Sequence, residues 1–233
     1  MNPTVAANLL SYNKKLFHMT TIETSTLAFL RDLAANNYKE WFTGNKDRYE
    51  AAKANVEAFR DSLWHAMNQV DVLEGIKIFR IYRDVRFSKD KSPYKNYFGL
   101  SMNRATAQRR GGYYFHLEPG ATFAGGGFFG PNAEDVRRIR QAFSEDDRPI
   151  RQVTADPEFK SYFGQLAGEE LKNAPRGFSN DDPAIDLIRK KSWIVRRPFR
   201  DDEVSQPGFP VELVKTYVAM LPYFNYMTKI LTE

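Results

Sequence analysis

The sequence lacks cysteine: none of its 233 residues carries a thiol. This absence excludes disulfide bonds, thiol catalysis and thiolate metal sites, and it fits a reducing compartment. Histidine is scarce as well, because only His18, His65 and His116 are present and they lie far apart in the chain. A metal site built from histidines is therefore not expected, and no cofactor-binding motif is found. We accordingly predict that the protein holds no metal and no cofactor.

Long apolar runs are also missing. No segment approaches the roughly 18–20 consecutive apolar residues that a membrane span needs. The start of the chain lacks the charged region and apolar core of a signal peptide. Helical periodicity begins just after Met19, so we interpret residues 1–18 as an N-terminal extension. Because no repeat, low-complexity run or Ser/Gly linker interrupts residues 19–233, we expect a single domain there. These features predict a cytoplasmic protein with no membrane partner.

Aromatic residues, by contrast, are abundant, and the charge balance is basic. Aromatic side chains make up 14% of the chain, with 18 Phe and 12 Tyr. Large rings dominate cores and contact surfaces, so this share predicts an aromatic core, an aromatic-lined pocket, or both. The formal net charge of +5 favours anionic partners. It does not distinguish nucleic acid, nucleotide, acidic peptide and phosphorylated metabolite.

Hydrophobic spacing predicts helices towards both ends of the chain and strands in the middle. The expected helices cover residues 24–35, 38–69 (which Gly44-Asn45 can split), 132–143, 147–154, 156–164 and 210–231, the last interrupted at Pro222. The expected strands cover residues 76–87, 97–104, 112–118, 122–129 and 192–199. This order predicts an α+β fold, with an antiparallel or mixed meander sheet in the middle of the chain packed by N-terminal and C-terminal helices.

Three consecutive glycines, Gly125-Gly126-Gly127, fall inside the expected strand 122–129. Glycine has no side chain to pack, so the run predicts a backbone bulge or a place where another group approaches closely. A phosphate-binding loop is excluded, since neither a Gly-Lys-Ser/Thr ending nor dinucleotide-binding spacing is present.

The segment from Arg80 to Lys95 is the most unusual stretch of the chain. It carries six basic and two acidic residues, a net charge of +4. Alternation along strand 76–87 separates two faces. One face, expected to meet the core, carries Phe79, Ile81, Arg83, Val85 and Phe87. The other carries Arg80, Tyr82, Asp84 and Arg86. After Phe87 the chain is expected to leave the sheet as a loop.

This composition predicts binding of a phosphate-bearing anion, such as a nucleotide, a nucleic acid or a phosphorylated metabolite. Guanidinium groups offer donors matched to phosphate, and tyrosines can stack on bases. The predicted ligand-binding residues are Arg80, Tyr82, Arg83, Arg86, Lys89, Lys91, Tyr94 and Lys95. Nucleic acid would require the basic groups at 80–95, 137–140 and 196–197 to share one face. Taken singly, the last two groups are typical of solvated surface.

Two other classes of function stay open. In an enzyme acting on a small phosphorylated or carboxylated substrate, Arg80 and Arg86 would stabilise charge, and Asp84 or His116 would act as acid or base. Asp84 would need a raised pKa to serve as a base. In a protein-interaction scaffold, Arg80 and Arg86 would be buried against acidic partners. Whether there is turnover, and what the oligomeric state is, the sequence does not decide.

His116 is a candidate because of its place in the expected strand 112–118. Alternation puts it on one strand face with Tyr114 and Glu118. If this strand neighboured residues 76–87, His116 would lie beside the basic segment and could transfer a proton there.

The run from Arg83 to Lys95 also resembles the signature of a family catalogued as domain of unknown function 2461. The similarity extends to Asn36-Asn37 followed by Trp41-Phe42, to Gly112-Tyr113-Tyr114, and to Gly125-Gly126-Gly127 followed by Pro131. It covers about residues 25–230, and the central motif is long and specific. The resemblance implies no activity, so it supplies no catalytic residue.

Overall fold

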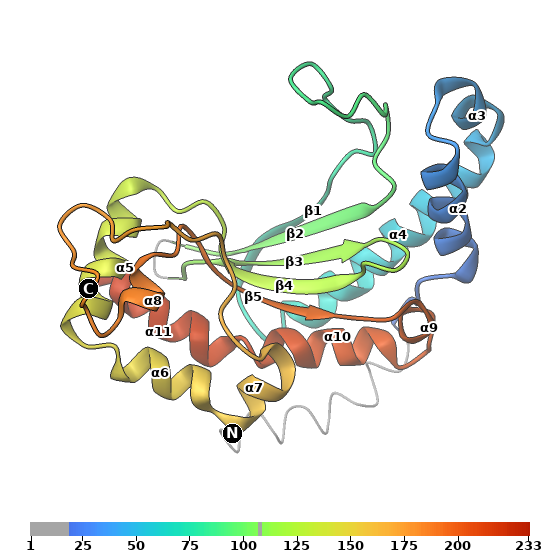
Figure 1. Ribbon diagram of the computed structural model, residues 1–233. Coiled ribbons are helices and arrows are strands. Elements are labelled where there is room, and N and C mark those ends of the chain that lie inside the picture. Colours follow the sequence, from blue (N-terminus) through green and yellow to red (C-terminus); the bar gives the residue numbers. More distant parts are fainter. Residues whose placement is uncertain (1–18, 107–108) are drawn as a thin grey trace.

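The computed structural model describes residues 19–106 and 109–233, and the predicted extension 1–18 lies outside the described residues. A five-stranded sheet occupies the middle of the structure, with strands in the order β1-β2-β3-β4-β5 (Figure 1). The strands are β1 (Leu73–Ile78), β2 (Phe98–Arg104), β3 (Gly112–Leu117), β4 (Phe123–Phe128) and β5 (Trp193–Pro198). Every neighbouring pair is antiparallel, which confirms the predicted α+β fold with a meander sheet.

Helices precede, interrupt and follow this sheet. Before it come α2 (Thr24–Ala35), α3 (Lys39–Gly44) and α4 (Lys46–Met67). Between β4 and β5 lie α5 (Ala133–Glu145), α6 (Arg148–Ala155), α7 (Pro157–Phe163) and α8 (Ile185–Ile188). The chain ends with α9 (Asp201–Val204), α10 (Phe209–Val218) and α11 (Leu221–Thr232). The expected breaks at Gly44-Asn45 and near Pro222 are confirmed.

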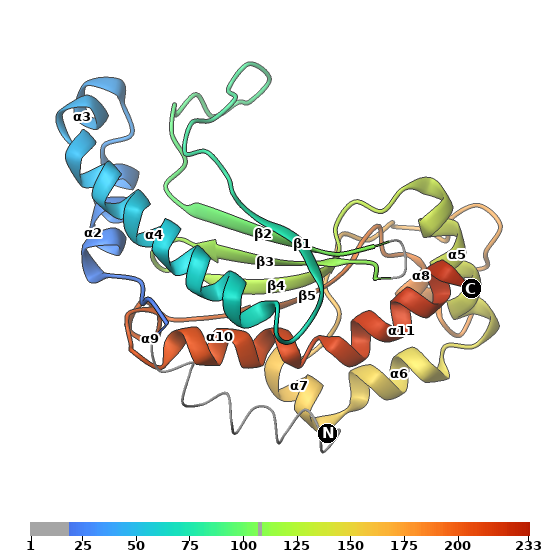
Figure 2. The ribbon, with the colours of Figure 1, turned by 180° about the vertical axis from the view of Figure 1, so that it is seen from behind.

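One face of the sheet is covered by α4, α10 and α11 (Figures 1 and 2). Leu100, Phe115 and Ala124 stand in register on neighbouring strands, and each side chain is fully buried. The ring of Phe59 on α4 lies 5.6 Å from the ring of Phe115. Since residues at alternate strand positions point to opposite faces, this packing assigns the remaining positions to the uncovered face. That face lies between α5 and α8 at one end of the strands and α2 and α3 at the other.

The glycine run in β4 is paired continuously on both sides, so the predicted bulge is wrong. Residues 124–127 are in register with β3 and with β5. The predicted close approach is confirmed. A side chain at Gly126 would collide with the sulfur of Met220, and Gly127 has a φ of +135° that other residues rarely adopt.

The expected strand 76–87 ends at Ile78, which corrects the sequence interpretation. Beyond it, the chain forms a two-stranded arm, residues 79–97, that projects from the sheet between β1 and β2 (Figure 1). Two backbone bonds hold the arm together: Arg83 N donates to Pro93 O at 2.9 Å, and Lys95 N donates to Ile81 O at 2.7 Å. Since β2 begins only at Phe98, residues 81–83 pair with the returning chain instead of the sheet.

The arm is attached to the helices at its base. The Asn37 side chain accepts from Tyr94 N at 3.1 Å and donates to Tyr94 O at 2.9 Å. The Tyr94 ring stacks on Phe42, with centroids 4.0 Å apart. These contacts give the Asn37 and Phe42 positions of the sequence motif a structural role.

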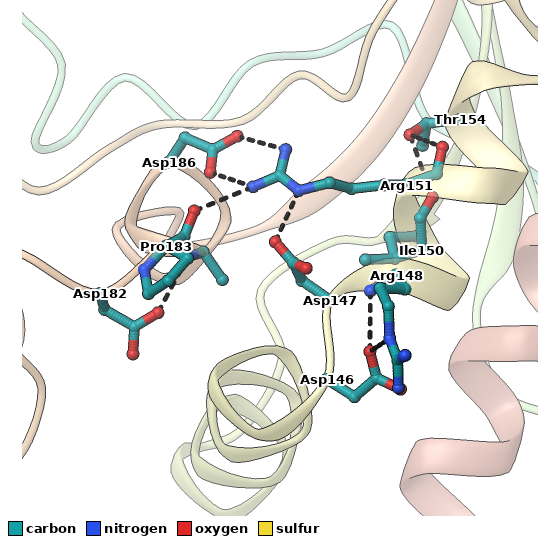
Figure 3. A network of polar contacts seen from close by, with 10 residues as sticks. Asp146, Asp147, Arg148, Ile150, Arg151, Thr154, Asp182, Pro183 and Asp186 are labelled. Atoms are coloured by element: carbon teal, nitrogen blue, oxygen red, sulfur yellow. Dashed lines mark hydrogen bonds and ion pairs between the residues drawn. The ribbon is translucent and has the colours of Figure 1, made fainter.

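An ion network around Arg151 connects α6 with α8 (Figure 3). The Arg151 guanidinium on α6 donates to Asp186 on α8 at 2.7 Å and to Asp147 at 2.5 Å. It also donates to the carbonyl of Pro183 at 3.2 Å. These bonds fasten α6 to the segment that leads into β5.

Candidate functional site

A hollow of about 800 Å³ lies over the uncovered face of the sheet. Tyr114 of β3, Gly125 of β4 and Arg196 of β5 stand in register across its floor. Because Gly125 has no side chain, the floor is low between Tyr114 and Arg196. Phe79 and Phe129 add further rings to the lining. The hollow is therefore lined by several aromatic rings, with Arg196 at one edge and the ion pair of Arg110 and Asp135 also in its lining.

At the β5 side of the hollow, a cation lies directly on a ring. The guanidinium carbon of Arg196 is 3.7 Å from the centroid of Phe123. The His116 ring also stacks on Phe123, with centroids 4.9 Å apart and an interplanar angle of 19°. Within the described residues, Arg196 forms no ion pair. Its charge is therefore available to a ligand.

At the arm side, the rings continue to a second cation. Tyr97 lies 4.3 Å from His116, measured between ring centroids. The Lys95 ammonium lies 5.8 Å from the Tyr97 centroid and 5.6 Å from the Phe79 centroid. We call the four rings Tyr97, Tyr114, His116 and Phe123 the aromatic strip. It crosses the uncovered face from Lys95 at the arm base to Arg196 on β5.

His116 belongs to this strip and to a hydrogen-bonded chain. Its Nε2 is 2.7 Å from the Glu118 carboxylate, and its Nδ1 is 3.3 Å from the Tyr114 hydroxyl. Asn96 donates to the other Glu118 oxygen at 2.6 Å. Burial, with Tyr97 and Glu118 nearby, raises the pKa of Tyr114 to about 12. The Tyr114 hydroxyl therefore stays protonated at neutral pH and can donate a hydrogen bond.

The predicted grouping of Tyr114, His116 and Glu118 on one strand face is confirmed. The condition for His116 to lie beside residues 76–87 is not met, because β2 separates β3 from β1. His116 approaches the arm through Tyr97 instead.

The basic residues of the arm divide into two groups. Arg83 pairs with Asp90, and Arg86 pairs with Asp84 at 2.6 Å. Among the described residues, no carboxylate pairs with the remaining four, which are Arg80, Lys89, Lys91 and Lys95. Burial, together with Arg80 and Arg83, lowers the pKa of Lys95. Burial is the largest cause of this shift, and the nearby charges of Arg80 and Arg83 add to it.

Asp84 does not have the raised pKa that a general base would need. Its hydrogen bonds from the side chain and backbone of Arg86 hold the pKa below its ordinary value. The carboxylate acts instead as a partner of Arg86. The arrangement expected of a scaffold is also absent, since the Arg86 side chain is 77% exposed and Arg80 is exposed.

The structure also separates the two tyrosines of the predicted cluster. Tyr82 is 51% exposed, whereas Tyr94 is 6% exposed and stacked on Phe42. The Tyr94 ring is therefore part of the arm base, whereas the Tyr82 ring is open to solvent. Phe87 was expected on the core side, but it is 96% exposed, because no core lies beneath the outer arm.

Sequence reasoning missed Arg196, Phe123 and Tyr97, and it assigned Phe79 to the core. Alternation within each strand could have indicated which residues share a face. Phe123 and Gly125 lie on one face of their strand, and Ile194 and Arg196 lie on one face of theirs. Alternation could not reveal which strands are neighbours or which face the helices leave uncovered.

Neither a metal centre nor a membrane span is evident in the described part of the chain. No three His, Asp or Glu side chains within residues 19–106 and 109–233 are grouped so that they could hold a metal ion. None of the described helices combines the length and apolarity that crossing a bilayer requires.

Fold and site together define an α+β protein with a half-covered antiparallel sheet, an aromatic strip and a basic arm. The family model described as conserved hypothetical protein (DUF2461) matches residues 25–226, and the chain belongs to this family. No curated protein and no solved structure matches the chain.

Proposed function

We propose that the protein binds a phosphate-bearing ligand with a planar ring, a nucleotide or a nucleic acid, on the uncovered face of the sheet. The observation that carries this proposal is the aromatic strip between Lys95 and Arg196, two cations with no acid partner among the described residues. Tyr114, which lines the hollow, can accept a base by stacking, and the cations at either end of the strip can meet phosphate.

The geometry at Arg196 supports phosphate binding by this side chain. Stacking on Phe123 occupies the flat face of the guanidinium and leaves its N–H edge free. That edge carries the paired donors that match two phosphate oxygens. Phe123 and His116 are half-buried in their places, so a ligand would order few side chains on binding.

A thermal-shift screen against nucleotides, phosphorylated metabolites and short oligonucleotides tests the proposal. A ligand that binds only the folded state raises the melting temperature. We expect an anionic, ring-bearing class to do so in the wild type and to lose the effect in Arg196→Ala and Lys95→Ala. Arg148→Ala is the matched control, because Arg148 is exposed on α6 and pairs only with Asp146. An unchanged shift in both site variants would contradict the proposal.

A second candidate function is proton transfer to a bound substrate by His116. The chain from Tyr114 through His116 to Glu118 favours it, since Glu118 can hold an imidazolium while Tyr114 faces the hollow. Asp84 has no part in this alternative. Mass spectrometry of a stabilising ligand after incubation tests it: His116→Gln should abolish any product, even at ligand concentrations that still raise the melting temperature of the variant. An unaltered ligand in the wild type would exclude it.

A further inference from the structure

The tip of the arm presents a bare aromatic ring. Phe87 is 96% exposed, the largest exposed fraction among the large apolar side chains of the described residues. Burying a phenylalanine side chain is favourable, and an exposed one forgoes that gain. The tip lies far from the helices in both views (Figures 1 and 2). No described residue is therefore placed to cover it.

Two basic side chains, Arg86 and Lys89, lie beside this ring in the structure or in the sequence. The guanidinium carbon of Arg86 lies 6.0 Å from the Phe87 centroid. Lys89 is exposed two residues further on and pairs with no described carboxylate. A protein interface would surround an anchor ring with apolar contacts and few charges. A ring among cations instead fits a base with phosphates on either side.

Hydrogen bonds within the arm tip hold its backbone in place and so keep the Phe87 ring exposed. Asp90 accepts hydrogen bonds from the Ser92 backbone at 2.9 Å and from the Ser92 hydroxyl at 2.7 Å. Its other oxygen pairs with Arg83. The Lys91 ammonium donates to the carbonyl of Val85 at 3.0 Å. These bonds join the two sides of the tip around Phe87.

We propose that the partner is single-stranded nucleic acid, which lies along the arm and the aromatic strip and stacks one base on Phe87. This inference rests on the proposed function and names its ligand class. The eight peptide units from Phe79 to Phe87 span at most about 29 Å. A ligand of several nucleotides is long enough to contact both the strip and the tip across such a span.

The path of the strand follows the cations that have no acid partner. It runs from Arg196 across the strip to Lys95 and Arg80, and then along the arm to Lys89. The basic group 137–140 is left out, because Arg137 and Arg138 both pair with Glu134 and Arg140 donates to the carbonyl of Lys190. The expectation that all three basic groups share one face is therefore not met: the proposed path uses the groups at 80–95 and 196–197 and leaves out 137–140.

The test is fluorescence anisotropy with labelled single-stranded 12-mers, alongside thermal shift with mononucleotides. We expect the wild type to bind the 12-mer more tightly than the mononucleotide. Phe87→Ala should weaken the 12-mer 5- to 100-fold, the range for losing one base stack. The same variant should leave the mononucleotide shift and the melting temperature unchanged, since Phe87 packs against nothing in the protein core.

Two further variants separate stacking from charge and from simple apolarity. Phe87→Leu keeps an apolar tip but removes the ring, so it should weaken the 12-mer like Phe87→Ala, whereas Phe87→Trp should retain binding. Lys89→Ala should reduce the slope of log K against log salt by about 0.7, the value for one phosphate contact on a single strand. Phe87→Ala should leave that slope unchanged.

Each opposite result has a definite meaning. Wild type that binds mononucleotides and 12-mers equally would overturn the strand inference and leave the proposed function standing. Absence of binding to both would overturn both. Full 12-mer affinity in Phe87→Leu would overturn base stacking at the tip. Binding to phosphatidylserine vesicles that requires Phe87, without 12-mer binding, would replace the nucleic acid with an anionic membrane surface.

Discussion

The guanidinium carbon of Arg196 lies 3.7 Å from the centre of the Phe123 ring, on the face of the sheet that no helix covers. A cation–π contact at an exposed site contributes about 0.5–1 kcal/mol. It holds the guanidinium in one orientation while its charge stays uncompensated by any described carboxylate. The pair borders Gly125, so no side chain stands between Arg196 and Tyr114 across β4. The space over Gly125, between Arg196 and Tyr114, can accept the edge of a planar ring of a ligand.

The two neighbouring glycines of β4 offer a matched pair of variants. A methyl group at Gly125 would lie 3.4 Å from the Phe123 ring, whereas one at Gly126 would collide with the buried sulfur of Met220. Gly125→Ala should therefore keep the fold and weaken ligand binding. Gly126→Ala should lower the free energy of unfolding by about 1–3 kcal/mol through overpacking. Urea denaturation measures the free energy of unfolding of the two variants, and a thermal shift with ligand measures binding by Gly125→Ala. Equal stability of the two variants would contradict this assignment of faces.

Asn37 should be required to hold the arm. Its side chain makes two hydrogen bonds to the backbone of Tyr94, and each contributes about 0.5–1.5 kcal/mol. Asn37→Ala should expose Lys and Arg sites in residues 80–95 to trypsin and accelerate cleavage there. Asn36→Ala is the control, because the Asn36 side chain donates only to the carbonyl of Asp32. Identical cleavage rates would contradict the role of Asn37.

The buried carboxylate of Asp71 should be indispensable for stability. It accepts from Arg104 Nε at 2.5 Å and from the Tyr113 hydroxyl at 2.8 Å, and all three residues are buried. Asp71→Ala would leave the Arg104 charge buried without its partner, at a cost of about 3–5 kcal/mol. Arg109→Ala removes only the half-exposed partner of Asp71 and should cost about 0–1 kcal/mol. Chemical denaturation of both variants measures the difference.

Stability should fall in alkaline solution. Burial raises the pKa of Tyr217 and of Tyr223 well above its ordinary value, and the pKa of Tyr114 is raised to about 12. Above about pH 10, the unfolded chain loses tyrosine protons that the folded protein keeps, so unfolding becomes easier. This contribution is complete below pH 10 and is lost as the pH rises through the folded pKa.

Urea midpoints between pH 8 and pH 11 test this expectation. The midpoint should decline most steeply above pH 10 in the wild type. Tyr223→Phe should decline less steeply, although losing the bond to the Trp193 carbonyl lowers its stability at every pH. A midpoint that stays level up to pH 11 would refute the argument.

Much of the secondary structure was predictable because its signals are local. The strands expected at 97–104, 112–118, 122–129 and 192–199 each agree with β2 to β5 within one or two residues. The first strand was misjudged, since alternation continued through Arg80 to Phe87 although no neighbouring strand was there to receive it.

The candidate site could be predicted only in part from local sequence signals. The charge of the segment 80–95 is a sequence property, and it pointed to the arm. Arg196 was assigned to ordinary solvated surface, because its stacking on Phe123 depends on β4 and β5 being neighbours. Tyr94 was grouped with the ligand-binding residues, because its burial depends on a contact with Phe42 more than fifty residues away.

The sequence by itself determined the α+β class, the meander of strands, the family motif and the concentration of positive charge between Arg80 and Lys95. These follow from periodicity and composition, which act over a few neighbouring residues. Only the tertiary structure decided which face of the sheet the helices cover, and thus that Arg196, Phe123 and His116 are joined to the arm through Tyr97. The physical reason is that a face becomes buried or open through contacts between distant segments, and alternation within one strand is the same in either case.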